Sequence, residues 1–143
     1  MQDDEIIIIY NVREEATDLW LIGKQQFQMF SLPLTEAQVK EQVTEFRNWG
    51  MEDEKTRDEK IITNNSADLA YWLNEYFTGF TEDSHALYQQ LFPQAVRDLL
   101  GQAKPKLLYI VPTSALYELP FEALITDNAA KPHSSAICRR LRC

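Results

Sequence analysis

The sequence contains few of the residues on which enzymes and disulfide-stabilised proteins depend. Its only two cysteines, Cys138 and Cys143, lie close to the C-terminus, and it has only two histidines, His85 and His133. The four glycines stand singly, at the expected ends of helices and strands, which argues against a glycine-rich phosphate loop. A nucleotide-binding enzyme of that kind is therefore not expected.

Long hydrophobic runs and basic residues are also scarce. No apolar run approaches the roughly 18 residues of a membrane span, and the acidic start Asp3-Asp4-Glu5 is unlike a signal peptide. We expect a cytoplasmic protein with no membrane partner and no disulfide between its cysteines. The 14 basic and 22 acidic residues give a net charge of -8, which argues against a nucleic-acid partner. The acidity is expected to serve solubility.

The basic residues that are present gather at one end. All 22 acidic residues precede residue 129, whereas Lys131, Arg139, Arg140 and Arg142 follow it. Residues 1–128 therefore carry a formal charge of -12, and residues 129–143 carry +4. This break in composition predicts one domain over residues 1–128 and an atypical basic tail over 129–143, which we expect to be disordered.

Three strands are expected in the first part of the chain. Ile6–Tyr10 is an uninterrupted β-forming run, and further strands are predicted over Thr17–Ile22 and Gln26–Ser31. Gly23-Lys24, with glycine first, predicts a two-residue type II′ turn between the second and third strands. The simplest arrangement of the three strands is an antiparallel meander.

Three helices are expected to follow. Thr35 and Gln38 predict a capping box, and Gly50 is a natural stop for the helix they begin. This first helix carries an apolar stripe, expected to pack on the sheet, at Val39, Val43 and Phe46. A solvated loop is expected over Met51–Lys60, whose charges lack the ligand spacing of a calcium loop.

The second helix is expected to run from about Ser66 to Gly79. Its apolar side chains are Leu69, Trp72, Leu73, Tyr76 and Phe77, and among them Trp72 and Tyr76 could form either a ligand-stacking wall or, as we expect, part of the core. The third helix is expected from about Ser84 to Leu100, kinked or restarted at Pro93 and ended by Gly101. Its apolar positions are Leu87, Tyr88, Leu91, Phe92, Ala95, Val96, Leu99 and Leu100.

The most apolar stretch of the chain lies in residues 104–124, KPKLLYIVPTSALYELPFEAL. Leu107–Val111 predicts a strand buried on both faces, as in a parallel sheet, and Pro112 ends it. Pro120 suits the start of a short helix that buries Phe121 and Leu124. The order of elements gives an α/β fold. No strand is expected after Thr126, so this core strand is left without a neighbour on one edge.

The stretch ending in Leu119-Pro120-Phe121-Glu122-Ala123-Leu124 resembles the CHAT domain, a caspase-like family of bacterial cysteine peptidases related to separase. IIIIYNV with TDLWLIG is similar to the family's first hairpin, Leu32-Pro33 to its next step, and HALYQQLFPQAV to the helix before the core strand. The resemblance covers residues 5–126 and implies the front portion of a caspase-like sheet.

The resemblance also implies catalytic segments that this chain does not contain. The family's His lies in a stretch resembling His-x-x-x-His-Gly and its Cys in one resembling Ser-x-Cys-x-Thr, and neither pattern occurs in this sequence. We therefore assign no catalytic, cofactor-binding or metal-binding residues. His85 is expected to be a surface or capping residue of a helix. The context of His133 and Cys138 matches neither motif, and with Cys143 they match no known zinc site.

Two other candidates are weaker on chemical grounds. Ser114 follows a strand but lacks the flanking glycines of a nucleophile elbow. Glu118 and Glu122 could share a helix face as paired carboxylates, but capping and solvation explain them more simply.

The sequence leaves three hypotheses open. The first is a truncated CHAT-domain protein, an inactive scaffold whose partner, by family resemblance, is a protein with tetratricopeptide repeats. The second is a complete small α/β protein-binding module without catalysis. The third is a hydrolase that uses Cys138 and His133, which predicts thiol-dependent activity lost in Cys138→Ser.

Overall fold

The computed structural model describes residues 4–50, 66–126 and 141–142. Side chains are described for 4–48 and 77–126. The strands are β1 (Glu5–Val12), β2 (Thr17–Gly23), β3 (Gln26–Leu32), β4 (Leu107–Val111) and β5 (Leu141–Arg142). The helices are α1 (Glu36–Gly50), α3 (Ser66–Leu91) and α4 (Gln94–Ala103), with short 3-10 turns η1 (Ser114–Glu118) and η2 (Phe121–Ala123).

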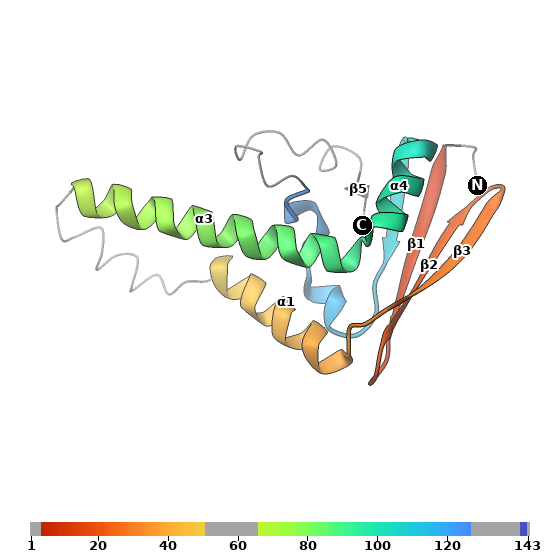
Figure 1. Cartoon of the computed structure of the whole chain (residues 1–143), viewed down its shortest axis with the longest axis horizontal. Coiled ribbons are helices and arrows are strands. Elements are labelled where there is room, and N and C mark those ends of the chain that lie inside the picture. Colours follow the sequence, from red (N-terminus) through yellow and green to blue (C-terminus); the bar gives the residue numbers. More distant parts are fainter. Residues whose placement is uncertain (1–3, 51–65, 127–140, 143) are drawn as a thin grey trace.

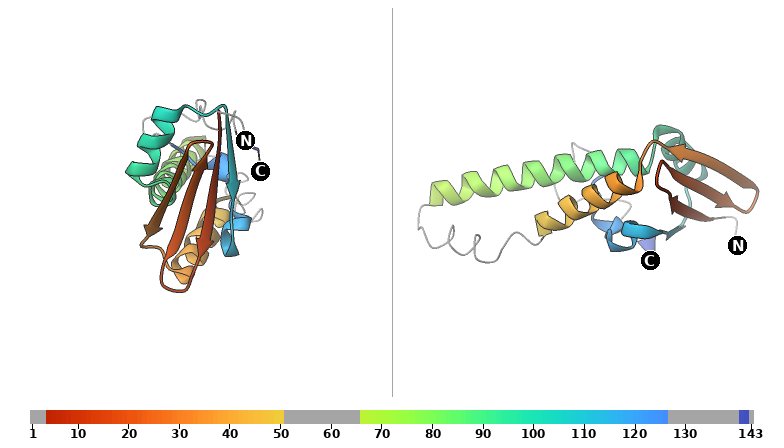
Figure 2. Two further views of the ribbon diagram at one scale, coloured as in Figure 1. Left: turned by 90° about the vertical axis from the view of Figure 1, so that its right-hand side faces the viewer. Right: turned by 90° about the horizontal axis from the view of Figure 1, so that it is seen from below.

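One mixed sheet, with strand order β3-β2-β1-β4-β5, organises the fold. The first three strands form the expected antiparallel meander, and β4 lies parallel to β1 on the other side. Helices α1, α3 and α4 all lie on the same side of this sheet (Figure 1). Figure 2 (left) shows the strands in front and the helices behind them. The predicted small α/β fold is confirmed.

The turn between β2 and β3 differs from the prediction. Gly23 belongs to β2 and pairs with Gln26 of β3, so the two connecting residues are Lys24 and Gln25. None of the described glycines has a positive φ, and neither does Lys24, so the predicted type II′ turn is wrong. Gly23 has a strand conformation because the pairing of β2 with β3 continues one residue beyond the predicted end of the strand at Ile22.

The helix boundaries in the middle of the chain also differ. We expected helices divided near Gly79, but α3 is continuous through this residue from Ser66 to Leu91. One glycine inside a helix costs only about 1 kcal/mol relative to alanine, which the burial of neighbours such as Leu87 outweighs. The break comes instead at Pro93, and α4 continues through Gly101 to a left-handed cap at Lys104.

Helix α1 begins as expected. The backbone N–H of Gln38 donates to Thr35 Oγ1 (3.2 Å), and the N–H of Thr35 donates to Gln38 Oε1 (3.0 Å), so the capping box is confirmed. The apolar stripe of α1 is buried at Val39, Val43 and Phe46. It packs mainly on η1 and α3 rather than directly on the sheet. On the described part of the second predicted helix, Phe77 is exposed rather than part of the core.

The hydrophobic core lies between the sheet and the helices, and Tyr10 is at its centre. Its side chain is fully buried, and its hydroxyl donates to the backbone carbonyl of Leu91 at the C-terminus of α3 (2.9 Å). The ring stacks on Phe121 of η2 and meets Phe92 edge-on. Phe121 and Leu124 are both buried, as predicted for the segment after Pro120. Tyr10 thus links β1 to segments far away in the sequence.

Two expectations about the core strand are corrected. Leu108 and Ile110 are buried, whereas on the other face Leu107 and Tyr109 are half-buried and Val111 is 43% exposed, so β4 is not fully buried on both faces. The edge that we expected to lack a neighbour is partly paired, because β5 lies parallel to β4 at Leu108 and Tyr109. Leu141–Arg142 thus belongs to the sheet, while residues 129–140 and the loop Met51–Lys60 lie outside the described residues.

Within the described residues, no helix combines the length and the apolarity that a membrane-spanning segment requires.

Replacing Tyr10 with phenylalanine is expected to destabilise the fold. The change leaves the carbonyl of Leu91 without its donor in a buried site, at a cost of about 1 to 3 kcal/mol. Urea denaturation monitored by circular dichroism measures this difference. Tyr117→Phe is the matched control, because Tyr117 is 70% exposed and its replacement should leave the free energy of unfolding unchanged. Equal stability of the two variants would contradict the role given to the Tyr10 hydroxyl.

The same substitution is expected to change the pH dependence of stability. Burial raises the pKa of the Tyr10 phenol well above its ordinary value of 10.0. Above that pH the unfolded chain releases this proton and the folded chain keeps it, so stability falls by about 1.4 kcal/mol per pH unit. The stability advantage of the wild type over Tyr10→Phe should therefore shrink between pH 9 and pH 11. A constant difference in urea denaturation across this range would argue against burial of the phenol.

Candidate functional site

The strand register divides the side chains of the sheet between two faces. One face, directed at the helices, holds the buried residues Ile6, Ile8, Tyr10, Leu19, Leu21, Leu108 and Ile110. The opposite face, which we call the open face, is also apolar, with Ile7, Ile9, Trp20, Ile22, Phe27, Met29, Leu107, Tyr109 and Val111. Apolar residues on both faces are typical of a sheet covered on both sides.

No helix within the described ranges covers the open face (Figure 2, left). Phe27 is 67% exposed, Met29 59% and Val111 43%, and the other six side chains are only partly shielded. The register places Trp20 between Ile9 of β1 and Met29 of β3, so the apolar surface is continuous across three strands. A continuous exposed apolar surface of this kind usually marks a site of contact with another protein segment.

Polar side chains border the open face at both ends of the strands. At one end Arg13 Nε and Asp18 Oδ2 are 2.8 Å apart, and Arg13 also donates to Asp18 Oδ1 (2.8 Å). These hydrogen bonds raise the pKa of the Arg13 guanidinium. At the other end Lys106 Nζ lies 2.7 Å from Asp4 Oδ2, and this hydrogen bond lowers the pKa of the Asp4 carboxyl. The centre is apolar, which suits protein contact rather than acid–base chemistry.

The strands that carry the open face were predicted from the sequence, but the open face and the exposure of its side chains were not. The unbroken apolar runs over Ile6–Tyr10 and Leu107–Val111 are the signal that could have identified the open face. Successive side chains of a strand point to opposite faces, so an unbroken apolar run places apolar side chains on both faces. The alternation of Phe27 and Met29 with glutamines in β3 is a second signal, because it places apolar side chains on one face of an edge strand.

His85 has a structural environment. It lies inside α3 rather than at the start of a helix, and its Nδ1 is 3.1 Å from the backbone oxygen of Ile125. Its Nε2 is 2.9 Å from the side-chain nitrogen of Gln89. The neighbouring Ser84 is fully buried and accepts a hydrogen bond from the N–H of Ile125 (2.9 Å). Ser84 and His85 therefore hold the chain after η2 against α3.

The remaining sequence candidates lie partly outside the described residues. His133, Cys138 and Cys143 lie outside the described residues, as do the side chains of Trp72 and Tyr76. Ser114 has a positive φ of 52°, and its hydroxyl donates to Glu36 Oε1 (2.8 Å). The partner of that hydroxyl is therefore a carboxylate. The serine of a Ser–His pair instead needs an imidazole as its base.

Glu118 and Glu122 do not share a helix, contrary to the alternative raised from the sequence. Glu118 belongs to η1 and pairs with Arg47 of α1, whereas Glu122 belongs to η2. Both line a groove of about 470 Å³ beside β4, together with Ile110, Pro112 and Phe121. They come from two different 3-10 turns, so they form an acidic border of this groove and are not the predicted pair on one helix face.

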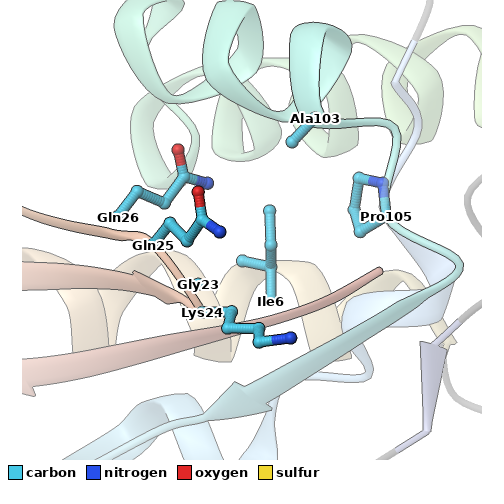
Figure 3. Close-up of a pocket in the computed structure, with 7 residues that line it drawn as sticks. All are labelled: Ile6, Gly23, Lys24, Gln25, Gln26, Ala103 and Pro105. Carbon is cyan, nitrogen blue, oxygen red and sulfur yellow. The ribbon is translucent and has the colours of Figure 1, made fainter. Parts of the chain in front are cut away.

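A second cavity, of about 370 Å³, lies between the turn after β2 and the segment joining α4 to β4. Figure 3 shows Ile6 between the carboxamides of Gln25 and Gln26 and the ring of Pro105, with Lys24 nearby. The residues that line it include no cysteine, histidine or carboxylate. Such a lining can bind a small polar group, but apart from the amine of Lys24 it supplies no nucleophile and no acid–base pair.

The described residues contain no group of three His, Cys, Asp or Glu side chains that could hold a metal ion. No family model, curated protein or solved structure matches the chain. The CHAT resemblance therefore stays a prediction based on the motifs quoted from the sequence.

Lysines on the open face should be tolerated where the structure is exposed. The double variant Phe27→Lys with Met29→Lys should change the free energy of unfolding by less than about 1 kcal/mol, because neither side chain is buried. It should also bind less of an apolar fluorescent dye such as anilinonaphthalene sulfonate. Leu21→Lys is the control on the opposite face of β2 and should cost about 4 kcal/mol or more. If urea denaturation showed a similar loss of unfolding free energy in both variants, the open face would have to be covered.

Proposed function

We propose that this chain is the scaffold part of a CHAT-like, caspase-related domain, on which the segments carrying the catalytic His and Cys are assembled. The observation that supports this proposal is the open face, a continuous apolar surface that no described helix covers. Parallel sheets normally carry helices on both faces, and β1 and β4 pair in parallel here. In this proposal, the rest of such a domain packs on the open face and on the outer edge of β4.

The energetics favour cover by a protein segment. At about 25 cal/mol per Å², covering roughly 400 Å² of this surface contributes about 10 kcal/mol. That is comparable to the whole stability of a typical domain, so a segment that belongs to the same folding unit would be held firmly. A separate protein must also offset the loss of translational and rotational freedom, estimated at about 4 to 15 kcal/mol, and would bind less tightly.

The scaffold on its own is proposed to be catalytically inactive. The single histidine in the described ranges, His85, is held by Ile125 and Gln89, and the family's two catalytic patterns are missing from the sequence. A protein containing tetratricopeptide repeats remains the partner that the resemblance suggests. In the third hypothesis, Cys138 and His133 would act as a dyad, and no observation favours it.

The alternative function is a small α/β module that binds another protein and performs no catalysis. The specific observation in its favour is β5, because the chain itself supplies a neighbour for part of β4. Thermal unfolding of the isolated chain separates the two proposals. A single cooperative, monomeric transition favours the module, whereas aggregation or a molten state favours the scaffold of a larger domain.

The genomic sequence beyond codon 128, read in all three frames, tests the proposed function directly. We expect one frame to encode two further apolar strands followed by His-x-x-x-His-Gly-like and Ser-x-Cys-x-Thr-like stretches. Expressing residues 1–128 in frame with that segment should increase the urea m-value and abolish dye binding to the open face. The absence of such stretches from every frame would overturn the CHAT proposal.

A peptidase assay on the chain as it stands gives a second test. The chain should not cleave denatured casein above the background rate, and Cys138→Ser should behave like the wild type. Cleavage that is blocked by iodoacetamide and lost in Cys138→Ser would instead establish the third hypothesis and contradict the scaffold proposal.

A further inference from the structure

Strand β3 forms one outer edge of the sheet, at the opposite end from β4 and β5. The strand order β3-β2-β1-β4-β5 places β2 on one side of β3, and within the described residues no strand lies on its other side. Figure 1 shows β3 as the outermost strand, on the side of the sheet away from α3. An edge strand carries a row of backbone N–H and C=O groups that can pair with a further strand.

The edge of β3 lacks the features that usually prevent such pairing. Proteins protect exposed edges with charged residues, prolines, bulges or very short strands. Strand β3 has seven residues, QFQMFSL, without a charge or a proline, and its register with β2 is continuous from end to end. Phe27 and Met29 are exposed on the open face, and Gln28 is exposed on the face directed at the helices. The strand is therefore available to another strand from both faces.

The charge of β3 favours a second copy of the chain as that other strand. The segment from Leu19 to Thr35 contains no Asp or Glu, although the whole chain carries a net charge of -8. A second copy of β3 therefore meets no carboxylate on this strand. A basic or acidic segment of another protein would find no opposite charge along β3 itself, so charge does not select it.

An antiparallel pair centred on Gln28 makes β3 complementary to itself. A two-fold axis perpendicular to the sheet at this residue places Phe27 of each copy opposite Met29 of the other. These side chains lie on the open face, where a thioether and an aromatic ring attract one another. The two Gln28 side chains meet on the opposite face, and their carboxamides suit each other because each has both a donor and an acceptor. The pair thus buries side chains that are exposed in the single chain.

We propose that the chain forms a two-fold dimer in which the β3 strands of two copies pair antiparallel and join their sheets into one. This pairing does not use the outer edge of β4, and it can form whether or not the chain belongs to a CHAT-like domain. A pair of seven-residue strands is small beside the roughly 1,600 Å² of a standard interface, so we expect a weak dimer, with a dissociation constant of about 10 to 100 µM.

Sedimentation of the full chain tests dimerisation. The weight-average mass should rise from the monomer's 16.7 kDa towards twice that value as the concentration increases from about 5 to 500 µM. Phe27→Lys with Met29→Lys should weaken the dimer at least about tenfold, because like charges then lie opposite one another. Ala95→Lys with Tyr117→Lys adds the same charge at exposed positions of α4 and η1, and should not weaken it. A monomer at every concentration, or an equal loss of dimer in the two variants, would overturn the proposal.

A charge swap within one chain tests the register. Phe27→Lys with Met29→Glu places opposite charges against each other at both positions of the pair centred on Gln28. This variant should therefore dimerise at least about fivefold more tightly than the double lysine variant. A pair centred on Met29 would instead oppose the two new carboxylates and show no recovery. Absence of recovery would contradict the proposed pairing.

Cross-linking separates edge pairing from stacking of two open faces. Gln28→Cys, made together with Cys138→Ser and Cys143→Ser, should form a disulfide-linked dimer in oxidised glutathione, because directly opposite Cβ atoms lie about 5 Å apart. Ser31→Cys in the same background should link at least about tenfold more slowly, since the two-fold axis at Gln28 separates its two copies by roughly 20 Å. Stacked open faces would leave Gln28 on the outside of the dimer. A dimer that Gln28→Cys fails to link would overturn the proposal.

Discussion

The parallel pairing of β1 with β4 is the constraint on which the rest of the structure depends. It joins strands about a hundred residues apart and aligns Ile6 with Leu108 and Ile8 with Ile110, so that their side chains form the floor of the core. The same register aligns Ile7 with Tyr109 and Ile9 with Val111 on the other side. One pairing therefore creates both the core and the open face, and neither can change without the other.

Polar contacts hold this pairing in place at both ends. The N–H of Lys106 donates to the carbonyl of Asp4 (2.8 Å) before the two strands begin. At the other end, the N–H of Val12, the last residue of β1, donates to Thr113 Oγ1 (2.9 Å), two residues after β4 ends. Between these contacts, the hydroxyl of Tyr10 connects β1 to the end of α3. Since these contacts are specific in direction and distance, they select one register where apolar packing alone would tolerate a slip.

Local chemistry explains which parts of this fold could be predicted from the sequence. The strands over β1–β4 and the capping box of Thr35 follow from residue types that act on their near neighbours. The continuity of α3 through Gly79 could not be predicted in this way, because packing of the surrounding turns outweighs the local cost of a glycine. The turn at Lys24-Gln25 was also missed, since strand pairing determines where β2 ends.

The candidate site shows a different limit. The apolar character of Ile7, Ile9 and Trp20 is visible in the sequence, and it predicts burial on both faces of the sheet. Exposure depends on which elements surround the sheet, and that information is not contained in a strand's own composition. The two-residue β5 was missed for a related reason, because a pairing so short has no periodicity to detect.

The open face also has a consequence for the behaviour of the protein in solution. Copies of the protein that each carry this apolar sheet surface, over which no described helix lies, are held apart mainly by their shared net charge of -8. Added salt screens this repulsion over distances of about 10 Å at 0.1 M, and acidification removes the charge itself. The colloidal stability of the protein thus depends on dilute, near-neutral buffer, and precipitation by salt reports on the same surface that a binding partner would cover.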